Sequence, residues 1–170
     1  FQKKEKPGLI DLAVIRFPRI SNFTDLAPLE ALEEVSVRYV SSPAEFGNPD
    51  AVILPGTKNT ISDLLWMRQN GLEAAVLKLA AKQVPVWGIC GGFQMMGEWL
   101  VDELAIESSY KGKIRGMGLF PVETEFEEEK VRTQTEGRFG ELYGCFRELS
   151  GKKLTGYEIH MGRTKSREKE

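Results

Sequence analysis

The sequence predicts an α/β fold of the flavodoxin-like class, with an open, mainly parallel sheet, helices on both faces and a C-terminal antiparallel extension. Three observations support this fold class. Short apolar runs alternate with helical patterns over about the first 100 residues, as in successive βαβ units. One of these runs leads into a cysteine flanked by glycines, as a sharp turn from strand to helix requires. Beyond Ser108, frequent glycines separate short strand-like segments.

The parallel part is expected to alternate strands with helices. The strands are predicted at Leu9–Phe17, Val35–Val40, Ala51–Leu54 and Val84–Ile89. The helices are predicted at about Asp25–Glu34, Thr60–Gln69 and Leu72–Lys82, with a fourth from the glycine-flanked cysteine through Leu100. Pro18 and Pro55 end two of the strands, and Gly71 ends a helix.

The segment after Ser108 is predicted to form the antiparallel extension. Its strands are expected at Gly118–Thr124, Val131–Thr135 and Lys153–Ile159, and the acidic run Glu125–Lys130 indicates a solvated turn. We expect residues 9–164 to form one domain that is truncated at its C-terminus, with a linker at residues 1–8 and a charged tail at residues 165–170.

Composition excludes several classes of protein. Hydrophobic residues make up 41% and charged residues 28%, as in a soluble globular protein. The formal net charge of -2 offers no electrostatic basis for binding nucleic acid or an anionic membrane. The two cysteines, Cys90 and Cys145, are too few for a disulfide framework and lack the spacing of zinc ligands. With no signal peptide and no apolar run long enough for a membrane span, we expect a cytoplasmic protein without a metal.

Cys90 is the candidate nucleophile. It stands in Gly88-Ile-Cys-Gly-Gly92, between an apolar strand and a helical pattern. Such a turn is crowded and strained, so glycines flank the nucleophile, and the start of the following helix favours the thiolate. A small structural cysteine buried in the turn is the alternative.

The loop Leu54-Pro-Gly-Thr-Lys-Asn-Thr60 follows a neighbouring strand. Ligands of open α/β sheets bind at the carboxyl ends of the strands. There the backbone N–H groups of Gly56 and Gly91 can converge on one oxygen, as an oxyanion hole requires. An ordinary turn at Gly56 remains the alternative. A phosphate-binding loop is not favoured, because its Gly-X-X-X-X-Gly-Lys-Ser/Thr pattern is absent.

His160 is the one histidine of the chain. A cysteine nucleophile usually works with a base, but a histidine at a strand end can equally be structural or contact the substrate. Glu158 lies two residues earlier, so both side chains point to the same face of an extended strand. The spacing by itself leaves the role of His160 open.

Three separated motifs carry a resemblance to a known family. Val52–Thr60, Gly88–Gly97 and Tyr157–Thr164 resemble, in the same order, segments of the glutamine amidotransferase domain of cobyric acid synthases, in the cobalamin-type branch of the class I (triad) amidotransferases. Arg16–Asp25 is similar to the start of that domain. The resemblance covers the chain from about Ile10 to Thr164.

The resemblance implies a glutaminase mechanism. Cys90 would attack the side-chain amide of glutamine, release ammonia and form a γ-glutamyl thioester that water hydrolyses. Gln94 matches the residue that holds glutamine, Gly56 and Gly91 match the oxyanion positions, and His160 is expected to line the site. The domain itself would need no cofactor. An N-terminal synthase domain of the same polypeptide, before Phe1, would use ATP and Mg to amidate the corrinoid adenosylcobyrinic acid a,c-diamide.

The chain departs from the family at one position. The catalytic histidine of the family lies in a Leu-His-Gly segment after the Glu-Ile-His-Met-Gly motif, and no Leu-His-Gly segment occurs in the 170 residues. The family branch also lacks the usual His-Pro-Glu triad ending, so a third triad member is not assigned. We therefore expect the isolated chain to be inactive, with its catalytic histidine beyond residue 170.

Three other interpretations remain open. Gly88-Ile-Cys-Gly-Gly92 also fits the elbow of cysteine-dependent α/β hydrolases such as dienelactone hydrolase. A sister amidotransferase would amidate another carboxylate, such as lipid II or cobyrinic acid. A non-catalytic module would bind glutamine or dock to a synthase.

Overall fold

The computed structural model describes residues 10–167, with all their side chains except those of residues 129–131 and 145. Two compact units make up the chain. Of the described residues, the first contains 10–126 and 163–167, and the second contains Glu127–Gly162. The predicted linker at residues 1–8 lies outside the described residues.

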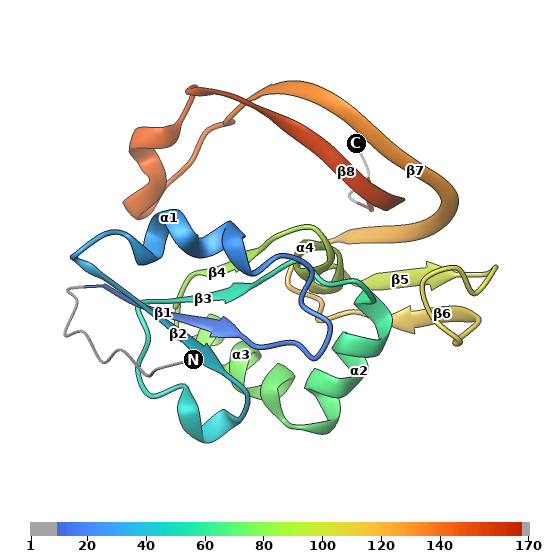
Figure 1. Ribbon diagram of the computed structural model, residues 1–170, viewed down its shortest axis with the longest axis horizontal. Helices are drawn as coiled ribbons and strands as arrows, with labels where there is room; N and C mark the ends of the chain where they lie inside the picture. Colours follow the sequence, from blue (N-terminus) through green and yellow to red (C-terminus); the bar gives the residue numbers. More distant parts are fainter. Residues whose placement is uncertain (1–9, 168–170) are drawn as a thin grey trace. The chain divides into compact units, whose positions relative to one another are not determined.

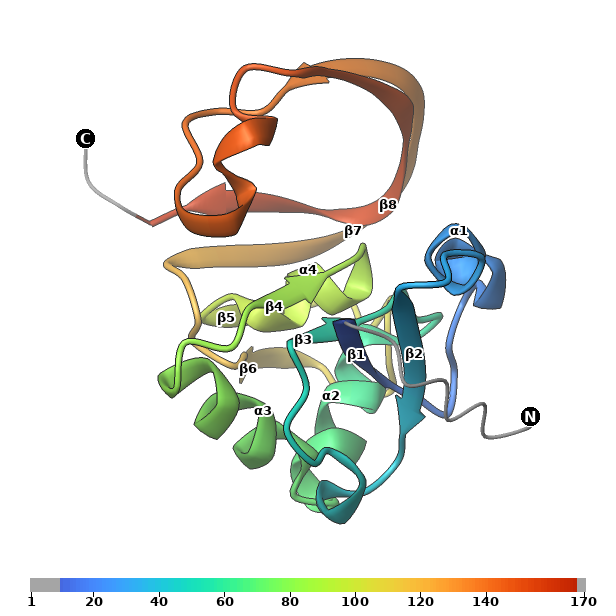
Figure 2. The same cartoon turned by 90° about the vertical axis from the view of Figure 1, so that its left-hand side faces the viewer.

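A parallel sheet forms the centre of the first unit (Figures 1 and 2). Its strands are β1 (Ile10–Ile15), β2 (Val35–Val40), β3 (Ala51–Leu54) and β4 (Val86–Gly88), in the order β2-β1-β3-β4. All three described pairings are parallel. This order belongs to the flavodoxin-like type, in which ligands bind at the carboxyl ends of the strands. The predicted parallel α/β sheet is therefore confirmed.

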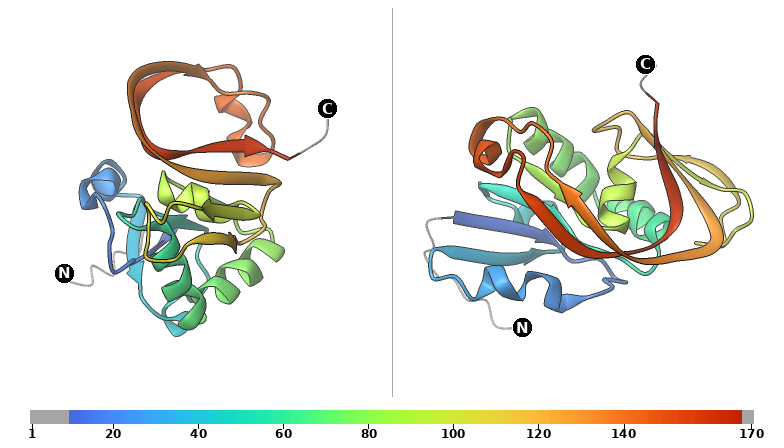
Figure 3. Two further views of the ribbon diagram at one scale, coloured as in Figure 1. Left: turned by 90° about the vertical axis from the view of Figure 1, so that its right-hand side faces the viewer. Right: turned by 90° about the horizontal axis from the view of Figure 1, so that it is seen from above.

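Helices cover both faces of this sheet (Figures 1 and 3). The 3₁₀ helix η1 (Phe23–Leu26) and α1 (Ala27–Glu30) pack on one face, where Leu26 contacts Val14 and Ile53. The opposite face carries α2 (Thr60–Gln69) and α3 (Leu72–Ala81). The side chain of Asn59 caps α2 by accepting a hydrogen bond from the N–H of Ser62 at 2.8 Å.

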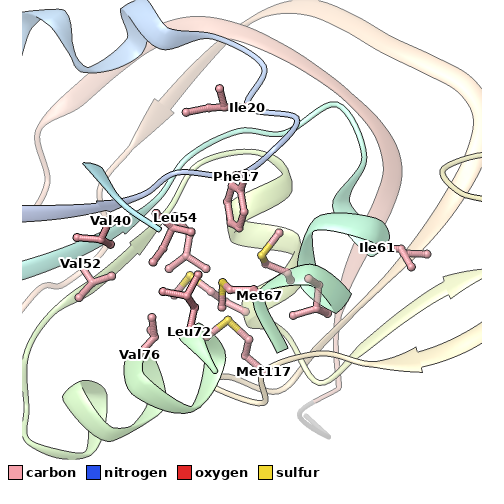
Figure 4. Packing of buried hydrophobic residues seen from close by; sticks show 14 of the residues in the cluster. Phe17, Ile20, Val40, Val52, Leu54, Ile61, Met67, Leu72, Val76 and Met117 are labelled. Atoms are coloured by element: carbon pink, nitrogen blue, oxygen red, sulfur yellow. The ribbon is translucent and has the colours of Figure 1, made fainter. Parts of the chain in front are cut away.

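The main core lies between the sheet and α2, α3 and α4 (Figure 4). Successive residues of β1 point to opposite faces, so Ala13 and Ile15 belong to this core and Val14 to the smaller cluster under α1. Leu54 of β3 and Met67 of α2 are fully buried here. Each large apolar side chain buried in this way contributes roughly 1.5–3 kcal/mol.

The predicted helix Asp25–Glu34 is wrong in length. The α-helical part is only Ala27–Glu30, preceded by the 3₁₀ turn of η1. Pro28 stands in the first turn of α1, the part of a helix that tolerates proline because no N–H is needed there. The strand and helix boundaries at Val35–Val40, Ala51–Leu54 and Thr60–Gln69 agree with the prediction.

The helix that follows Cys90 was predicted to reach Leu100, and this is also wrong. The helix α4 (Gly91–Met96) ends at Gly97, whose backbone is extended, and Trp99–Asp102 form strand β5. A Cβ atom at Gly97 would lie 2.8 Å from the carbonyl oxygen of Val122, and one at Gly116 would overlap the carbonyl oxygen of Gly97. In both cases the backbone of Gly97 lies against a residue far along the chain, Val122 or Gly116. These contacts end the helix, and the chain continues as a strand of a second sheet.

The second sheet has the strand order β6-β5-β7-β8. Its further strands are β6 (Gly112–Arg115), which the sequence did not predict, β7 (Val122–Arg138) and β8 (Lys153–Ser166). Strand β5 pairs antiparallel with β6 and parallel with β7, so the sheet is mixed rather than purely antiparallel. Two short 3₁₀ helices, η2 (Pro43–Glu45) and η3 (Gly144–Leu149), complete the elements.

The acidic run Glu125–Lys130 is not a turn but part of β7. Thr124 and Phe126 are buried while their neighbours Glu125 and Glu127 are exposed, so this part of the run alternates as a strand does. Strand β8 continues through Ser166, two residues into the predicted tail. No helix of the described residues is both long and apolar enough to span a membrane.

Candidate active site

Cys90 occupies a strained turn between β4 and α4. Its φ of 50° and ψ of -113° lie in a region that residues with a side chain rarely adopt. A conformation of this kind costs about 1–3 kcal/mol and occurs mostly at functional sites. The residue is exposed, so the alternative of a buried structural cysteine is wrong.

The glycines around Cys90 allow a very close approach of backbone to backbone. A Cβ atom at Gly88 would lie 2.5 Å from the Cα of Phe93. One at Gly92 would overlap the carbonyl oxygen of Leu54, the last residue of β3. The end of β3 is therefore pressed against the start of α4, and any larger residue at position 92 would force them apart.

The loop after β3 lies directly against this turn. A Cβ atom at Gly56 would be 3.7 Å from the Cβ of Cys90. One at Gly91 would be 2.7 Å from the Cγ2 of Thr57 and 2.9 Å from the Oγ1 of Thr60. The structure thus brings together Cys90, Gly56 and Gly91, the three residues that the sequence predicted to share a site.

The amides of Gly56 and Gly91 are candidate donors to a ligand. Among the described residues, neither N–H donates a hydrogen bond to another group of the protein. The carbonyl of Gly56, in contrast, accepts a hydrogen bond from the N–H of Ser21 at 2.9 Å, which fixes the orientation of the loop. Two unengaged N–H groups beside an exposed thiol can bind an oxygen that gains negative charge.

Gln94 lies one helical turn after Cys90 and is buried. Its backbone N–H donates to the carbonyl of Cys90 at 2.9 Å, and its Oε1 accepts a hydrogen bond from the hydroxyl of Thr60 at 3.3 Å. The side chain is therefore held toward the first residue of α2, on the side where Thr60 also faces Gly91.

A buried carboxylate that the sequence analysis missed holds the loop after β3. Asp63 is fully buried and accepts hydrogen bonds from the hydroxyl of Thr57 at 2.5 Å and from Nη1 of Arg19 at 3.0 Å. The N–H of Lys58 also donates to the carbonyl of Arg19 at 2.9 Å. The sequence places Asp63 in the first turn of the predicted helix Thr60–Gln69, but it gives no sign of the contacts to Arg19, which span 44 residues.

A second missed carboxylate reaches Thr60 from the loop after β5. Glu107 accepts a hydrogen bond from the N–H of Thr60. Burial raises the pKa of the Glu107 carboxyl, and the hydrogen bonds from the backbone and side chain of Thr60 oppose this shift. The carboxylates of Asp102 and Asp63 also raise this pKa.

His160 lies in the second unit, on β8. Its Nδ1 is 2.8 Å from the carbonyl oxygen of Gly162, which only accepts, so Nδ1 donates. Its Nε2 is 2.7 Å from Oε1 of Glu158. Both ring nitrogens therefore lie within hydrogen-bond distance of oxygen atoms of the same strand. Glu158 and His160 do share a face of the strand, as their spacing predicted.

Comparison with known proteins shows the family of the chain. Residues 11–170 match the model of the CobB/CobQ-like glutamine amidotransferase domain. The chain belongs to this family. The membership confirms the resemblance found in the sequence, and it sets the α/β hydrolase interpretation of the Cys90 elbow aside.

Curated relatives of this amidotransferase domain are larger proteins. The cobyric acid synthase of Ruminiclostridium cellulolyticum is 56% identical over 99% of the chain, which covers 32% of that protein. The cobyric acid synthase of Lachnoclostridium phytofermentans is 54% identical over 90% of the chain, which covers 29% of it. The chain thus spans about a third of the length of the curated relatives it matches.

Solved structures confirm the fold of this amidotransferase domain. A crystal structure of a glutamine amidotransferase matches 92% of the chain and 74% of its own length, with a TM-score of 0.58 and 14% identity. The structure of PurLQS from Thermotoga maritima matches 94% of the chain and 70% of its own length, with a TM-score of 0.60 and 16% identity. At such identities the likeness concerns the fold alone.

Proposed function

We propose that this domain hydrolyses glutamine through a thioester on Cys90 and supplies the ammonia to an amidation reaction. One observation supports the proposal above the others. The thiol of Cys90 is exposed on a strained turn, beside the two unengaged N–H groups of Gly56 and Gly91. A nucleophile next to paired donors is what acyl transfer from an amide requires.

The proposed reaction uses these groups in turn. The Cys90 thiolate adds to the carbonyl carbon of the glutamine side-chain amide, and the oxygen gains the negative charge. The N–H groups of Gly56 and Gly91 stabilise that oxygen; one such donor changes kcat by about 10²–10³ in other enzymes. The C–N bond then breaks, and the nitrogen takes a proton from solvent and leaves as ammonia. Water hydrolyses the γ-glutamyl thioester to glutamate and free thiolate, and the protons of this water return to solvent.

Gln94 and His160 have supporting roles in this proposal. Gln94 holds the substrate glutamine, since its buried amide is already oriented by Thr60. His160 is a substrate-lining residue rather than the proton acceptor, because both of its ring nitrogens already lie within hydrogen-bond distance of protein oxygen atoms. We expect His160→Ala to raise the glutamine KM and to leave thioester formation intact. Complete loss of the thioester would instead restore His160 as the base.

The acceptor of the ammonia is proposed from the relatives. They are named cobyric acid synthases and are about three times as long as the chain. We infer that an ATP- and Mg-dependent synthase part of the same polypeptide amidates adenosylcobyrinic acid a,c-diamide in cobalamin biosynthesis. The glutaminase domain needs no cofactor in this scheme. A sister enzyme with another carboxylate acceptor is distinguished by assaying cobyrinic acid and its a,c-diamide side by side.

Cys90→Ala tests the proposal in the intact protein. We expect the variant to lose glutamine-dependent amidation and to keep amidation from free ammonia. In the wild type, 6-diazo-5-oxonorleucine should label Cys90, as a peptide mass shift would show, and glutamine should protect it. Loss of both activities in Cys90→Ala would mean that the residue is structural.

A further inference from the structure

Thr60 connects three parts of the first unit around Cys90. Its hydroxyl donates to Oε1 of Gln94 at 3.3 Å, and the same oxygen would lie 2.9 Å from a Cβ atom at Gly91. Its backbone N–H donates to the carboxylate of Glu107. A displacement of Thr60 would therefore reach both the amide of Gly91 and the side chain of Gln94.

The backbone around Glu107 is itself tightly held. The fully buried carboxylate of Asp102 accepts hydrogen bonds from the N–H groups of Ile106, Glu107 and Ser108 at 2.7, 3.0 and 3.1 Å. The Nδ2 of Asn59 donates to the carbonyl of Glu107 at 2.6 Å. The loop after β5 thus presents Glu107 to Thr60 from a fixed position.

The helix α2 does not depend on Glu107 for its cap. Asn59 already accepts a hydrogen bond from Ser62 and caps the helix. A carboxylate that is desolvated at this point is unfavourable, as the raised pKa of Glu107 indicates. Helix capping therefore does not explain the contact between Glu107 and Thr60. Thr60 also contacts Gln94 and faces Gly91, which belong to the proposed glutamine site.

We propose that Glu107 is a positioning residue of the glutamine site, which holds Thr60 so that its hydroxyl orients Gln94 and leaves the Gly91 amide open to substrate. The proposal rests on the proposed function. Glu107 does not touch the substrate. It acts through Thr60, on the residues that do.

Three variants of the intact protein test this role. Glu107→Ala removes the acceptor for the Thr60 N–H, whereas Glu107→Gln keeps an oxygen in its place. Glu103→Ala is the matched control, because Glu103 is exposed on the same loop and forms no hydrogen bond among the described residues. The readouts are kcat and KM for ammonia release from glutamine, amidation from free ammonia, and the unfolding temperature.

We expect Glu107→Ala to raise the glutamine KM about 10-fold or more, as the loss of a hydrogen bond to a charged group can do. Amidation from free ammonia should not change. Glu107→Gln should restore the KM to within about 3-fold of wild type, and Glu103→Ala should match wild type. An unchanged KM in Glu107→Ala overturns the proposal, as does a parallel loss of both activities together with the unfolding temperature.

Thr60→Val provides a second test if Glu107→Ala fails to fold. It removes the hydroxyl, which reaches both Gln94 and the carboxylate of Glu107, and keeps the backbone N–H that binds Glu107. We expect a similar rise in the glutamine KM, and an unchanged KM overturns the proposal. A wild-type protein that releases no ammonia from glutamine contradicts the proposed function itself. Normal wild-type activity with a normal KM in the variants contradicts only the positioning role.

Discussion

The buried carboxylate of Asp63 accepts a hydrogen bond from the hydroxyl of Thr57 at 2.5 Å, and this contact ties the loop after β3 to the first turn of α2. The same loop carries Gly56 against Cys90. The position of a proposed oxyanion donor therefore depends on a carboxylate that never reaches the site surface.

Asp63→Ala should destabilise the protein more than Arg19→Ala. Removing Asp63 takes away a carboxylate that accepts from the hydroxyl of Thr57 and from the guanidinium and backbone N–H of Arg19, a loss of about 1–3 kcal/mol in the free energy of unfolding. Removing Arg19 leaves the Thr57 contact in place, and its side chain is half exposed, so the loss should be under about 1 kcal/mol. Urea unfolding measures both. An equal or larger loss in Arg19→Ala would contradict this order.

Gly92→Ala should disrupt the turn at Cys90. The added Cβ would overlap the carbonyl oxygen of Leu54 and lie 2.8 Å from the carbonyl oxygen of Pro55, and these are backbone atoms, which cannot turn aside as the end of a flexible side chain can. We expect a loss of about 3 kcal/mol or more, or a failure to fold. Gly140→Ala is the matched control, since nothing lies within 4 Å of its Cβ position. A Gly92→Ala protein as stable as Gly140→Ala, by thermal unfolding, would show that β3 and α4 are not in close contact.

Cys90→Gly should be more stable than Cys90→Ala. Both variants lack the thiol, but only glycine adopts a φ of 50° with a ψ of -113° without strain. The expected difference in the free energy of unfolding is about 1 kcal/mol or more. Chemical unfolding of the two variants side by side measures it. Equal stability would mean that the turn relaxes once the sulfur is removed, and that the strain is not stored in the backbone.

The stability of Glu107→Gln relative to wild type should increase as the pH rises from 4 to 7. Burial and the carboxylates of Asp102 and Asp63 raise the pKa of Glu107 above its ordinary value of 4.5. In that window the folded wild type binds more protons than the unfolded chain, so its stability falls with rising pH. The amide side chain of the variant does not titrate, so the variant escapes this loss. Urea unfolding of both proteins at several pH values measures their free energies of unfolding. A variant-minus-wild-type difference that falls as the pH rises contradicts the prediction.

Features that depend on neighbouring residues could be predicted from the sequence. The glycines beside Cys90, the start of α2 at Thr60 and the apolar run of β3 each depend on a few adjacent residues, and the structure has them where the sequence placed them. The loop at Gly56 was found for the same reason, because the carboxyl ends of parallel strands meet at one edge of the sheet.

Features that depend on distant contacts could not be predicted. Trp99–Asp102 continues a helical pattern, but Gly97 fits against Val122 and Gly116, and the segment becomes β5. The acidic residues of β7 suggested a turn, although Thr124 and Phe126 between them are buried as in a strand.

The sequence by itself determined the parallel α/β fold, the strained turn at Cys90 and the two loops that meet there. Only the tertiary structure decided that Asp63 and Glu107 hold those loops. It also decided that both ring nitrogens of His160 lie within hydrogen-bond distance of oxygen atoms. The physical reason is one of range. Turns, caps and strand ends follow from steric and hydrogen-bonding limits on adjacent residues, whereas a carboxylate acquires its partners only when strands and loops far apart in the chain have packed together.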